Sequence, residues 1–261
     1  MEKLKSHGKC IFCNKDFAKA SITRHLSAHL KEKAITGAQG KSFQLKIEVN
    51  PRYGSAPYFL SLWMDGIATL NDLDNFLRRI WLNCCGHMSA FTNPKNARRG
   101  IWSLLDLDEF TMDIENMGFE NRMDDANGEI PMERLAKEAL TKDLKLNYEY
   151  DFGSTTKLQI TVVDEFPIRA DEKIVLLSRN EPLEIMCEKC GKKPATQLCT
   201  ICMCDGSESA FCDSCAKKHA KKCNDFADYA AAQVVNSPRM GVCAYDGGTT
   251  DTERDGVYKM K

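Results

Sequence analysis

Long apolar runs are missing from this sequence. No run approaches the roughly 20 apolar residues that a membrane-spanning helix needs, so we expect no membrane association. The opening residues, MEKLKSHGKC, are charged and lack the apolar core of a secretory signal. The formal net charge is -1, so no overall basic field would draw the whole chain to nucleic acid. We therefore expect a soluble, cytoplasmic protein in which charge acts locally.

Familiar catalytic motifs are also missing. The chain contains no P-loop, no GxGxxG and no HExxH sequence. Outside the predicted zinc-ligand sets described below, our candidate nucleophiles or bases are His7, His87 and Cys243, and they are far apart in sequence. We therefore expect no catalysis. The open alternative is a metal-dependent hydrolase in the central domain, with acidic residues near His87.

Cysteine, by contrast, is abundant, with 13 residues in 261. Nine potential soft-metal ligands lie within the 37 residues from Cys187 to Cys223, and a C-x2-C pair occurs three times among them. A structural zinc ion takes four thiolate or imidazole ligands. Eight ligands in four pairs would hold two ions; these are Cys187, Cys190, Cys199, Cys202, Cys212, Cys215, His219 and Cys223.

The alternation of these four pairs favours cross-bracing, with the first and third pairs on one zinc and the second and fourth on the other. Sequential pairing stays open, and Cys204 could replace Cys202. A disulfide framework would need an oxidising compartment, and no secretory signal is seen. The ligand order resembles that of the B-box and MYND modules, which implies an interaction module. Metal would supply most of the folding free energy of this segment.

A second zinc pattern occupies residues 1–33. Cys10 and Cys13 are followed, after 11 residues, by His25 and His29. The usual two-Cys, two-His finger has about 12 residues in that gap. The spacing predicts a C2H2-like ββα finger whose helix runs from about Lys19 to Lys31, so the chain would bind about three zinc ions in all.

This first segment is also the clearly basic one, with eight Lys or Arg residues against three acids. Such a surface suits phosphate contacts. Of the helix positions that usually face bases, Ala18, Ser21 and Arg24, only Arg24 is a strong base reader. The expected nucleic-acid contacts are Lys15, Lys19, Ser21, Arg24, Lys31 and Lys33. A structural or protein-binding finger is the alternative, because one finger covers only about three base pairs.

Residues 34–42 are small and polar and indicate a linker. Alternating apolar residues from Phe43 and an apolar run over 58–64 then predict two strands. Thr69 and Asp72 predict a capping box for a following helix, with Gly86 as its stop. Cys84, Cys85 and His87 near its end could be a partial metal site. We expect buried thiols and a packed histidine instead, because no fourth ligand is nearby in sequence.

Residues 106–129 form an acidic segment, which is typical of a solvated surface. Pro131 and the apolar spacing after it predict a second helix over 131–144. Alternation in 148–162 around Gly153 and Ser154 predicts a β-hairpin that includes Phe152, and 173–177 predicts a further short strand. The fold class is therefore α+β: a central mixed domain of sheet and helices over 43–180, flanked by two small zinc-binding modules.

These central residues carry a family resemblance. The strand pair, TLNDLDNFLRRIWLNCCGHMSAF, the acidic segment and YEYDFGSTTKLQI together resemble the plasmid pRiA4b ORF-3-like family over about residues 41–180. Where many members continue the hairpin with an acid, a tryptophan and a histidine, this chain has Ser154, Thr156 and Leu158. The tail NSPRMGVC resembles the branch with a cysteine-rich C-terminal module. The resemblance implies the fold and domain order, and its mobile-element setting is compatible with DNA transactions.

Together these patterns predict a finger (1–33), a linker (34–42), a central domain (43–180), a Cys-rich module (181–230) and a C-terminal tail (231–261). We expect a zinc-containing binding protein with nucleic acid, DNA first, as its partner. The alternative is a protein adaptor that uses the zinc modules and the acidic segment. Oligomeric state is open.

Overall fold

The computed structural model describes residues 4–51, 57–94 and 128–260. Its largest element is an antiparallel sheet of seven strands in the order β6-β5-β7-β8-β3-β4-β9. The acidic segment 106–129 lies outside the described residues apart from its last two. The strands of this sheet are β3 (Gln39–Val49), β4 (Phe59–Asp65), β5 (Ser89–Thr92), β6 (Glu129–Ile130), β7 (Lys145–Tyr150), β8 (Thr156–Ile168) and β9 (Ile174–Arg179).

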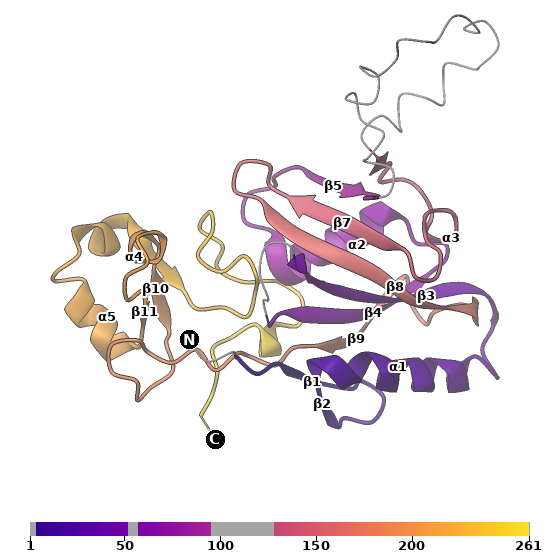
Figure 1. The fold of residues 1–261 in the computed structure, drawn as a ribbon, viewed down its shortest axis with the longest axis horizontal. Helices are drawn as coiled ribbons and strands as arrows, with labels where there is room; N and C mark the ends of the chain where they lie inside the picture. Colours follow the sequence, from indigo (N-terminus) through magenta and orange to yellow (C-terminus); the bar gives the residue numbers. More distant parts are fainter. Residues whose placement is uncertain (1–3, 52–56, 95–127, 261) are drawn as a thin grey trace, which may run out of the picture.

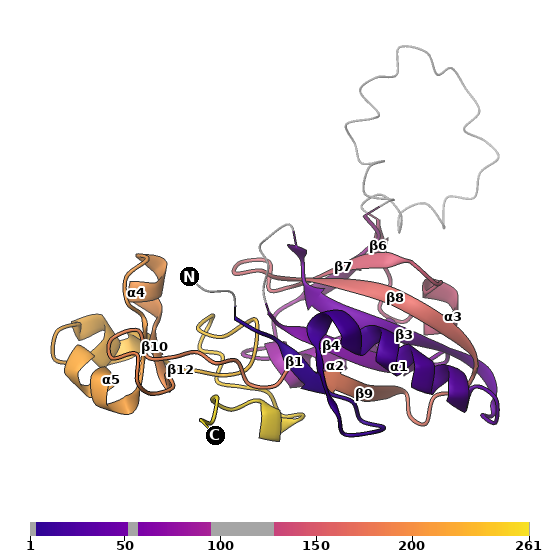
Figure 2. The ribbon, with the colours of Figure 1, turned by 60° about the horizontal axis from the view of Figure 1, so that its bottom comes forward.

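Helices pack on both faces of this sheet (Figures 1 and 2). β4 is buried at all seven of its positions because both faces are covered. On one face, Leu60 and Leu62 join the main core with α2 (Leu70–Leu77). On the other face, Phe59 and Trp63 join a second core with α1 (Lys19–Lys33). The sheet therefore separates two hydrophobic cores, and the α+β fold class is confirmed.

The start of α2 is fixed by its sequence, as predicted. The Thr69 hydroxyl accepts a hydrogen bond from the Asp72 N–H at 3.1 Å, and the Asp72 carboxylate accepts one from the Thr69 N–H at 2.9 Å. This reciprocal capping satisfies two backbone donors that the helix itself leaves free. After α2 the chain continues through a π-helical turn, Arg78–Leu82, so the helical segment ends before Gly86.

The N-terminal finger (residues 7–33) has the predicted ββα order: β1 (His7–Lys9), β2 (Asp16–Ala18) and α1. It is joined to the central sheet directly. The Ile11 N–H donates to the Leu177 carbonyl at 3.1 Å, and the Glu181 N–H donates to the His7 carbonyl at 2.8 Å. The finger therefore extends the β9 edge of the sheet.

Two predictions for the central domain are wrong. β3 begins at Gln39 inside the predicted linker, because Gln39 pairs with Ile168 at the end of the long strand β8. The helix predicted over 131–144 shrinks to α3 (Ala136–Ala139). Its preceding backbone is used elsewhere: the carbonyls of Met132 and Arg134 accept from the first N–H groups of α2. Tertiary hydrogen bonds override the helical periodicity there.

The predicted hairpin is formed by β7 and β8, in which Tyr148 pairs with Leu158 and Tyr150 with Thr156. Asp151 closes the turn. Its backbone φ is 64°, and its carboxylate accepts a hydrogen bond from the Gly153 N–H at 3.0 Å. Phe152 is not part of the predicted alternation, because it lies in this turn and is 52% exposed.

The Cys-rich module (residues 187–233) is a separate small body beside the sheet, shown in orange in Figure 1. Its three-stranded sheet has the order β11-β10-β12. Because β12 ends at Gln233, the module reaches three residues past the predicted boundary at 230. Its elements are β10 (Gln197–Cys199), α4 (Thr200–Cys204), β11 (Ala210–Phe211), α5 (Asp213–His219), the π-helical turn Phe226–Ala230 and β12 (Ala231–Gln233).

The C-terminal tail (residues 234–260) returns to the central domain and ends past a 3-10 turn, Thr252–Arg254. Two fully buried arginines hold the tail against the central domain. Arg179 of β9 donates to the Asp255 carboxylate at 2.6 Å, and Arg239 of the tail donates to Asp151 at 2.6 Å. The tail is therefore a structural part of the central domain. Among the described helices, none has the length and apolar character that crossing a membrane would demand.

Candidate metal centres and basic surfaces

The first predicted ligand set is gathered in the finger. The ligand atoms of Cys10, Cys13, His25 and His29 all lie within 4.8 Å of one another. The Cys13 sulfur is 3.3 Å from His25 Nε2, which is 3.2 Å from His29 Nε2. Burial, His29 and Lys15 lower the pKa of His25, which favours the neutral imidazole that binds metal. Four such donors at this spacing fit one metal ion.

The Cys-rich module contains two further sets, and they follow the cross-braced pairing. One set joins Cys187 and Cys190 with Cys212 and Cys215, and the other joins Cys199 and Cys202 with His219 and Cys223. The structure thus groups Cys202, and not Cys204, with the second set. Sulfur separations of 3.9 Å between Cys190 and Cys212 and 4.0 Å between Cys199 and Cys223 fit ligands shared by one ion.

The local backbone explains why these ligands converge. Cys212 is the residue before α5, and Cys215 and His219 lie one turn apart along it, so a single short helix serves both sets. The Gly191 N–H donates to the Cys187 carbonyl at 2.8 Å, and Gly191 has a positive φ of 59°. This is a tight turn that only glycine adopts without strain, and it brings the first two thiols together.

A fourth group was not expected from the sequence. Cys84, Cys85 and His87 meet Cys243 of the tail, again with all ligand atoms within 4.8 Å. The expectation that the thiols of Cys84 and Cys85 are buried is wrong, because Cys84 is only half-buried and Cys85 is exposed. A fourth ligand is present after all, but it comes from 156 residues beyond His87. The adjacent cysteines with a histidine two residues later were the available sequence signal, and nothing local pointed to Cys243.

The predicted nucleic-acid contacts lie on or beside α1 but differ in their surroundings. Lys19 pairs with Glu48 at 2.9 Å, and Lys31 lies 3.5 Å from Asp164. Lys33 pairs with Asp171 at 2.8 Å. The remaining predicted contacts, Lys15, Ser21 and Arg24, are exposed, and neither Lys15 nor Arg24 forms an ion pair with a described acid.

A second basic surface lies on the Cys-rich module. We call it the α5 lysine cluster; it consists of Lys217, Lys218, Lys221 and Lys222. All four lysines are exposed, and within the described parts of the chain none forms an ion pair. Three of them line a pocket of about 680 Å³ that also reaches Phe211 and the ligand His219. Metal binding at Cys215, His219 and Cys223 would therefore fix α5, which carries Lys217 and Lys218, and the turn after it, which carries Lys221 and Lys222.

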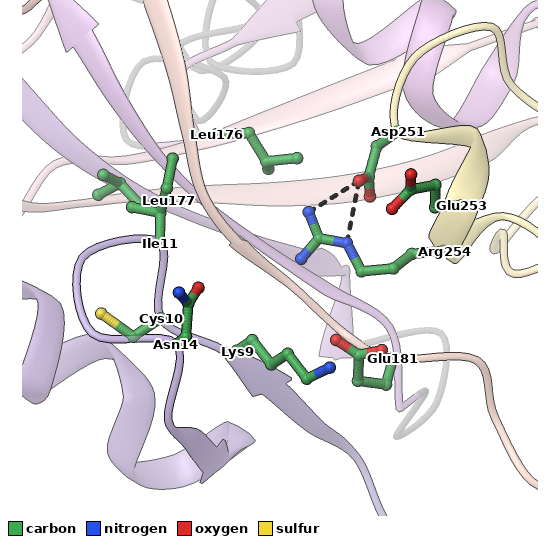
Figure 3. Close-up of a pocket in the computed structure, with 10 residues that line it drawn as sticks. All are labelled: Lys9, Cys10, Ile11, Asn14, Leu176, Leu177, Glu181, Asp251, Glu253 and Arg254. Carbon is green, nitrogen blue, oxygen red and sulfur yellow. Dashed lines mark hydrogen bonds and ion pairs between the residues drawn. The ribbon is translucent and has the colours of Figure 1, made fainter.

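Another pocket, of about 410 Å³, lies where the finger, β9 and the tail meet (Figure 3). Arg254 points across it to Asp251 and donates two hydrogen bonds, at 2.9 and 2.7 Å. None of the ten described residues lining it is a histidine, and its cysteine, Cys10, belongs to the finger's ligand set. His87, on which the hydrolase hypothesis depends, does not line this pocket.

Comparison with known proteins adds little to this picture. No protein-family model matches the sequence, and no curated protein matches it. Among solved structures, the chain is similar to a protein of unknown function, MM3350, from Methanosarcina mazei Go1, at 15% identity and a TM-score of 0.34. That similarity covers 54% of this chain and 68% of the other. The resemblance to the plasmid pRiA4b ORF-3-like family therefore stays a prediction.

Proposed function

We propose that this protein is a zinc-containing nucleic-acid-binding protein, with DNA as the first choice, that contacts phosphates and performs no catalysis. The observation that carries the proposal is the α5 lysine cluster, four exposed lysines without an ion-pair partner in the described chain. Lys217 and Lys218 lie on α5 and Lys221 and Lys222 in the turn that follows it, and unpaired lysines offer positive charge to phosphates without first breaking an internal contact. The finger adds a smaller contact surface around Arg24.

Zinc is the metal we assign to these centres. All of their ligands are cysteine sulfur or histidine nitrogen, and each set has four. Thiolate and imidazole ligands in a tetrahedral set are typical of structural zinc. Four protein ligands leave no open coordination position for substrate, so the ions would be structural. Their role in binding would be to hold α1 and α5 in place.

The paired lysines of the finger shift the expected contact surface. If Lys19 or Lys33 bound a phosphate, its ion pair with Glu48 or Asp171 would have to break, and this would offset part of the free energy gained from the phosphate contact. Arg24 carries no such cost and remains the finger residue best suited to nucleic acid. We therefore place the stronger phosphate contacts on the α5 lysine cluster and a weaker one at Arg24.

The test is binding of the full chain to a labelled 20-base-pair duplex, measured by anisotropy between 50 and 200 mM salt. Each phosphate contact contributes about 0.9 to the slope of log affinity against log salt. Changing all four lysines of the α5 cluster to glutamine should lower that slope by about 3 to 4 and weaken binding at low salt. Arg24→Ala should lower it by about 1.

The matched control also removes four positive charges, but from lysines paired with acids on the central domain. These are Lys41, Lys142, Lys157 and Lys173. Their change to glutamine should leave the slope nearly unaltered. No binding of wild-type protein to DNA or RNA at 50 mM salt, or an equal loss in both quadruple variants, would overturn the proposal.

A protein adaptor is the second candidate. The observation in its favour is that three finger lysines are held by acids of the central domain, which makes the finger a packed part of the sheet. In that case the finger would present Ser21 and Arg24 to a protein surface. The adaptor predicts no salt-dependent nucleic-acid binding, so the same anisotropy experiment separates the two functions.

A further inference from the structure

We propose a fourth zinc site, built by Cys84, Cys85, His87 and Cys243, that fastens the C-terminal tail to the central domain. The site is separate from the proposed nucleic-acid surfaces, so this inference does not depend on the proposed function. Its ligands come from two parts of the chain. Three follow the helical turn after α2, and the fourth comes from the tail 156 residues after His87.

The four ligand atoms lie within 4.8 Å of one another, close enough to surround one ion. The Cys85 sulfur lies 2.9 Å from His87 Nε2, 3.4 Å from the Cys243 sulfur and 3.7 Å from the Cys84 sulfur. His87 Nε2 is 3.3 Å from the Cys243 sulfur. Zinc bonds of about 2.3 Å to sulfur and 2.0–2.1 Å to nitrogen place neighbouring ligand atoms roughly 3.5–3.8 Å apart. The four ligand atoms are thus close enough to share one ion.

The same separations in the other sets make a useful internal standard. Neighbouring ligand atoms there are 3.2–3.3 Å apart in the finger and 3.6–4.0 Å apart in the Cys-rich module. The unexpected group is therefore as tightly gathered as the three groups whose spacing predicts zinc. Two adjacent cysteines usually point apart, yet here their sulfurs lie 3.7 Å apart on one side of the chain.

Surrounding residues hold the ligands in place. Arg239 donates to the Cys84 sulfur at 3.4 Å, and the Tyr150 hydroxyl lies 3.9 Å from the same atom. Asp151 is 3.5 Å from His87 Nε2 and could compete for it. Its carboxylate is already occupied, however, because it accepts from Arg239 at 2.6 Å and from the Gly153 N–H at 3.0 Å. Neighbouring groups that hydrogen-bond to the ligands and orient them in this way accompany metal sites.

The tail's own path points to the same conclusion. Cys243 and Ala244 have positive φ angles of 50° and 52°, a conformation that non-glycine residues rarely adopt. Just before them, the tail is anchored by buried groups: Ser237 donates to the Trp81 carbonyl at 2.7 Å, and Arg239 to Thr156 at 3.0 Å. A zinc ion on Cys243 would stabilise the unusual turn that follows this anchor.

The test counts zinc per chain by native mass spectrometry of full-length protein purified under reducing conditions. We expect four ions in the wild type and three in Cys243→Ser. Cys204→Ser is the matched control, because Cys204 is also exposed but belongs to none of the four groups. That variant should keep four. Cys85→Ala gives a second ligand variant, should Cys243→Ser fail to fold, and should also hold three.

A second readout follows the tail itself. In Cys243→Ser, protease cleavage after residue 240 should become faster, while cleavage of Cys204→Ser should match the wild type. Three zinc ions in the wild type with no further loss in Cys243→Ser would overturn the proposal. A disulfide between Cys85 and Cys243 in the reduced preparation, in place of the fourth ion, would overturn it as well.

Discussion

The finger and the Cys-rich module both gather cysteine and histidine ligands, but they are stabilised in different ways. The finger contributes Ile22, Leu26 and Leu30 of α1 to a core shared with the central sheet, and all three are fully buried. The main cluster of the Cys-rich module consists mostly of its own ligands, with Phe211 and Phe226 as its large members, and a second, smaller cluster contains Ala195, Leu198, Ala210 and Val234. Metal ligands thus supplement packing in the finger and largely replace it in the module.

The finger and the Cys-rich module also differ in the ion pairing of their lysines. The finger's Lys19, Lys31 and Lys33 lie against acids of the central domain, whereas the α5 lysine cluster has no ion-pair partner among the described residues. The comparison teaches that a basic segment in a sequence need not be a basic surface. The segment with the clearer charge excess faces its own domain, and the more exposed charge lies on the other module.

The largest expected effect comes from removing one ligand in each region. Cys215→Ser should unfold the Cys-rich module, because metal supplies most of its stability; structural zinc contributes on the order of 10 kcal/mol or more in small fingers. Cys13→Ser should leave α1 in place on the sheet. Hydrogen exchange of peptides from α5 and α1 measures both outcomes. Equal loss of protection in the two helices would show that the finger depends on metal as much as the module does.

A smaller effect should follow from weakening the finger's packing. Leu26→Ala removes a fully buried side chain between α1 and the sheet and should lower the free energy of unfolding by about 2–5 kcal/mol. Urea unfolding can follow this change through Trp63, which is buried in the same core. Ile35→Ala is the control, because Ile35 is 82% exposed and its change should cost little. A similar midpoint in both variants would contradict the packing account.

The smallest effect concerns the charge pairing of the finger. Burial alone would raise the pKa of Glu48, but Lys46 and Lys19 outweigh it and hold the pKa below its usual value. A depressed carboxyl pKa stabilises the fold above the unfolded pKa, about 4.3, and that contribution is lost as pH falls through the folded pKa.

Glu48→Gln should therefore destabilise the protein at pH 7 by roughly 0.5–1 kcal/mol, since the pair is only partly exposed. The difference from wild type should shrink as pH falls below about 4.3 and vanish once the pH is below the folded pKa of Glu48. Unfolding at several pH values measures it, with Glu32→Gln, an exposed acid of α1, as the control. A difference that persists unchanged at low pH would show that Glu48 acts by packing and not by charge.

Local patterns predicted much of this fold. Thr69 and Asp72 form the expected capping box, the apolar run of β4 is buried on both faces, and the Tyr148–Leu158 pair lies in the expected hairpin. Each depends on residues close in sequence whose local preference agrees with the tertiary structure. The same holds for the three predicted ligand sets, since C-x2-C pairs are local and their regular alternation suggested how they combine.

Features that depend on distant contacts could not be predicted. The helix expected over 131–144 is mostly absent because its backbone carbonyls serve the start of α2. The tail gave no hint that Arg239 would be buried against Asp151. Cys243 has no other cysteine or histidine near it in sequence, and it becomes a candidate ligand only when the tail folds back beside Cys85. These contacts depend on how distant parts of the chain pack together, which the spacing of residues in the sequence does not reveal.

The most direct test of this account is the zinc content of the purified full-length chain, measured by elemental analysis alongside protein concentration. Four Cys/His groups with metal-like spacing predict four zinc ions per chain. Three ions would remove the site at Cys243 and leave the two modules as described. A metal-free chain that keeps α1 and α5 folded would contradict the claim that metal orders the Cys-rich module.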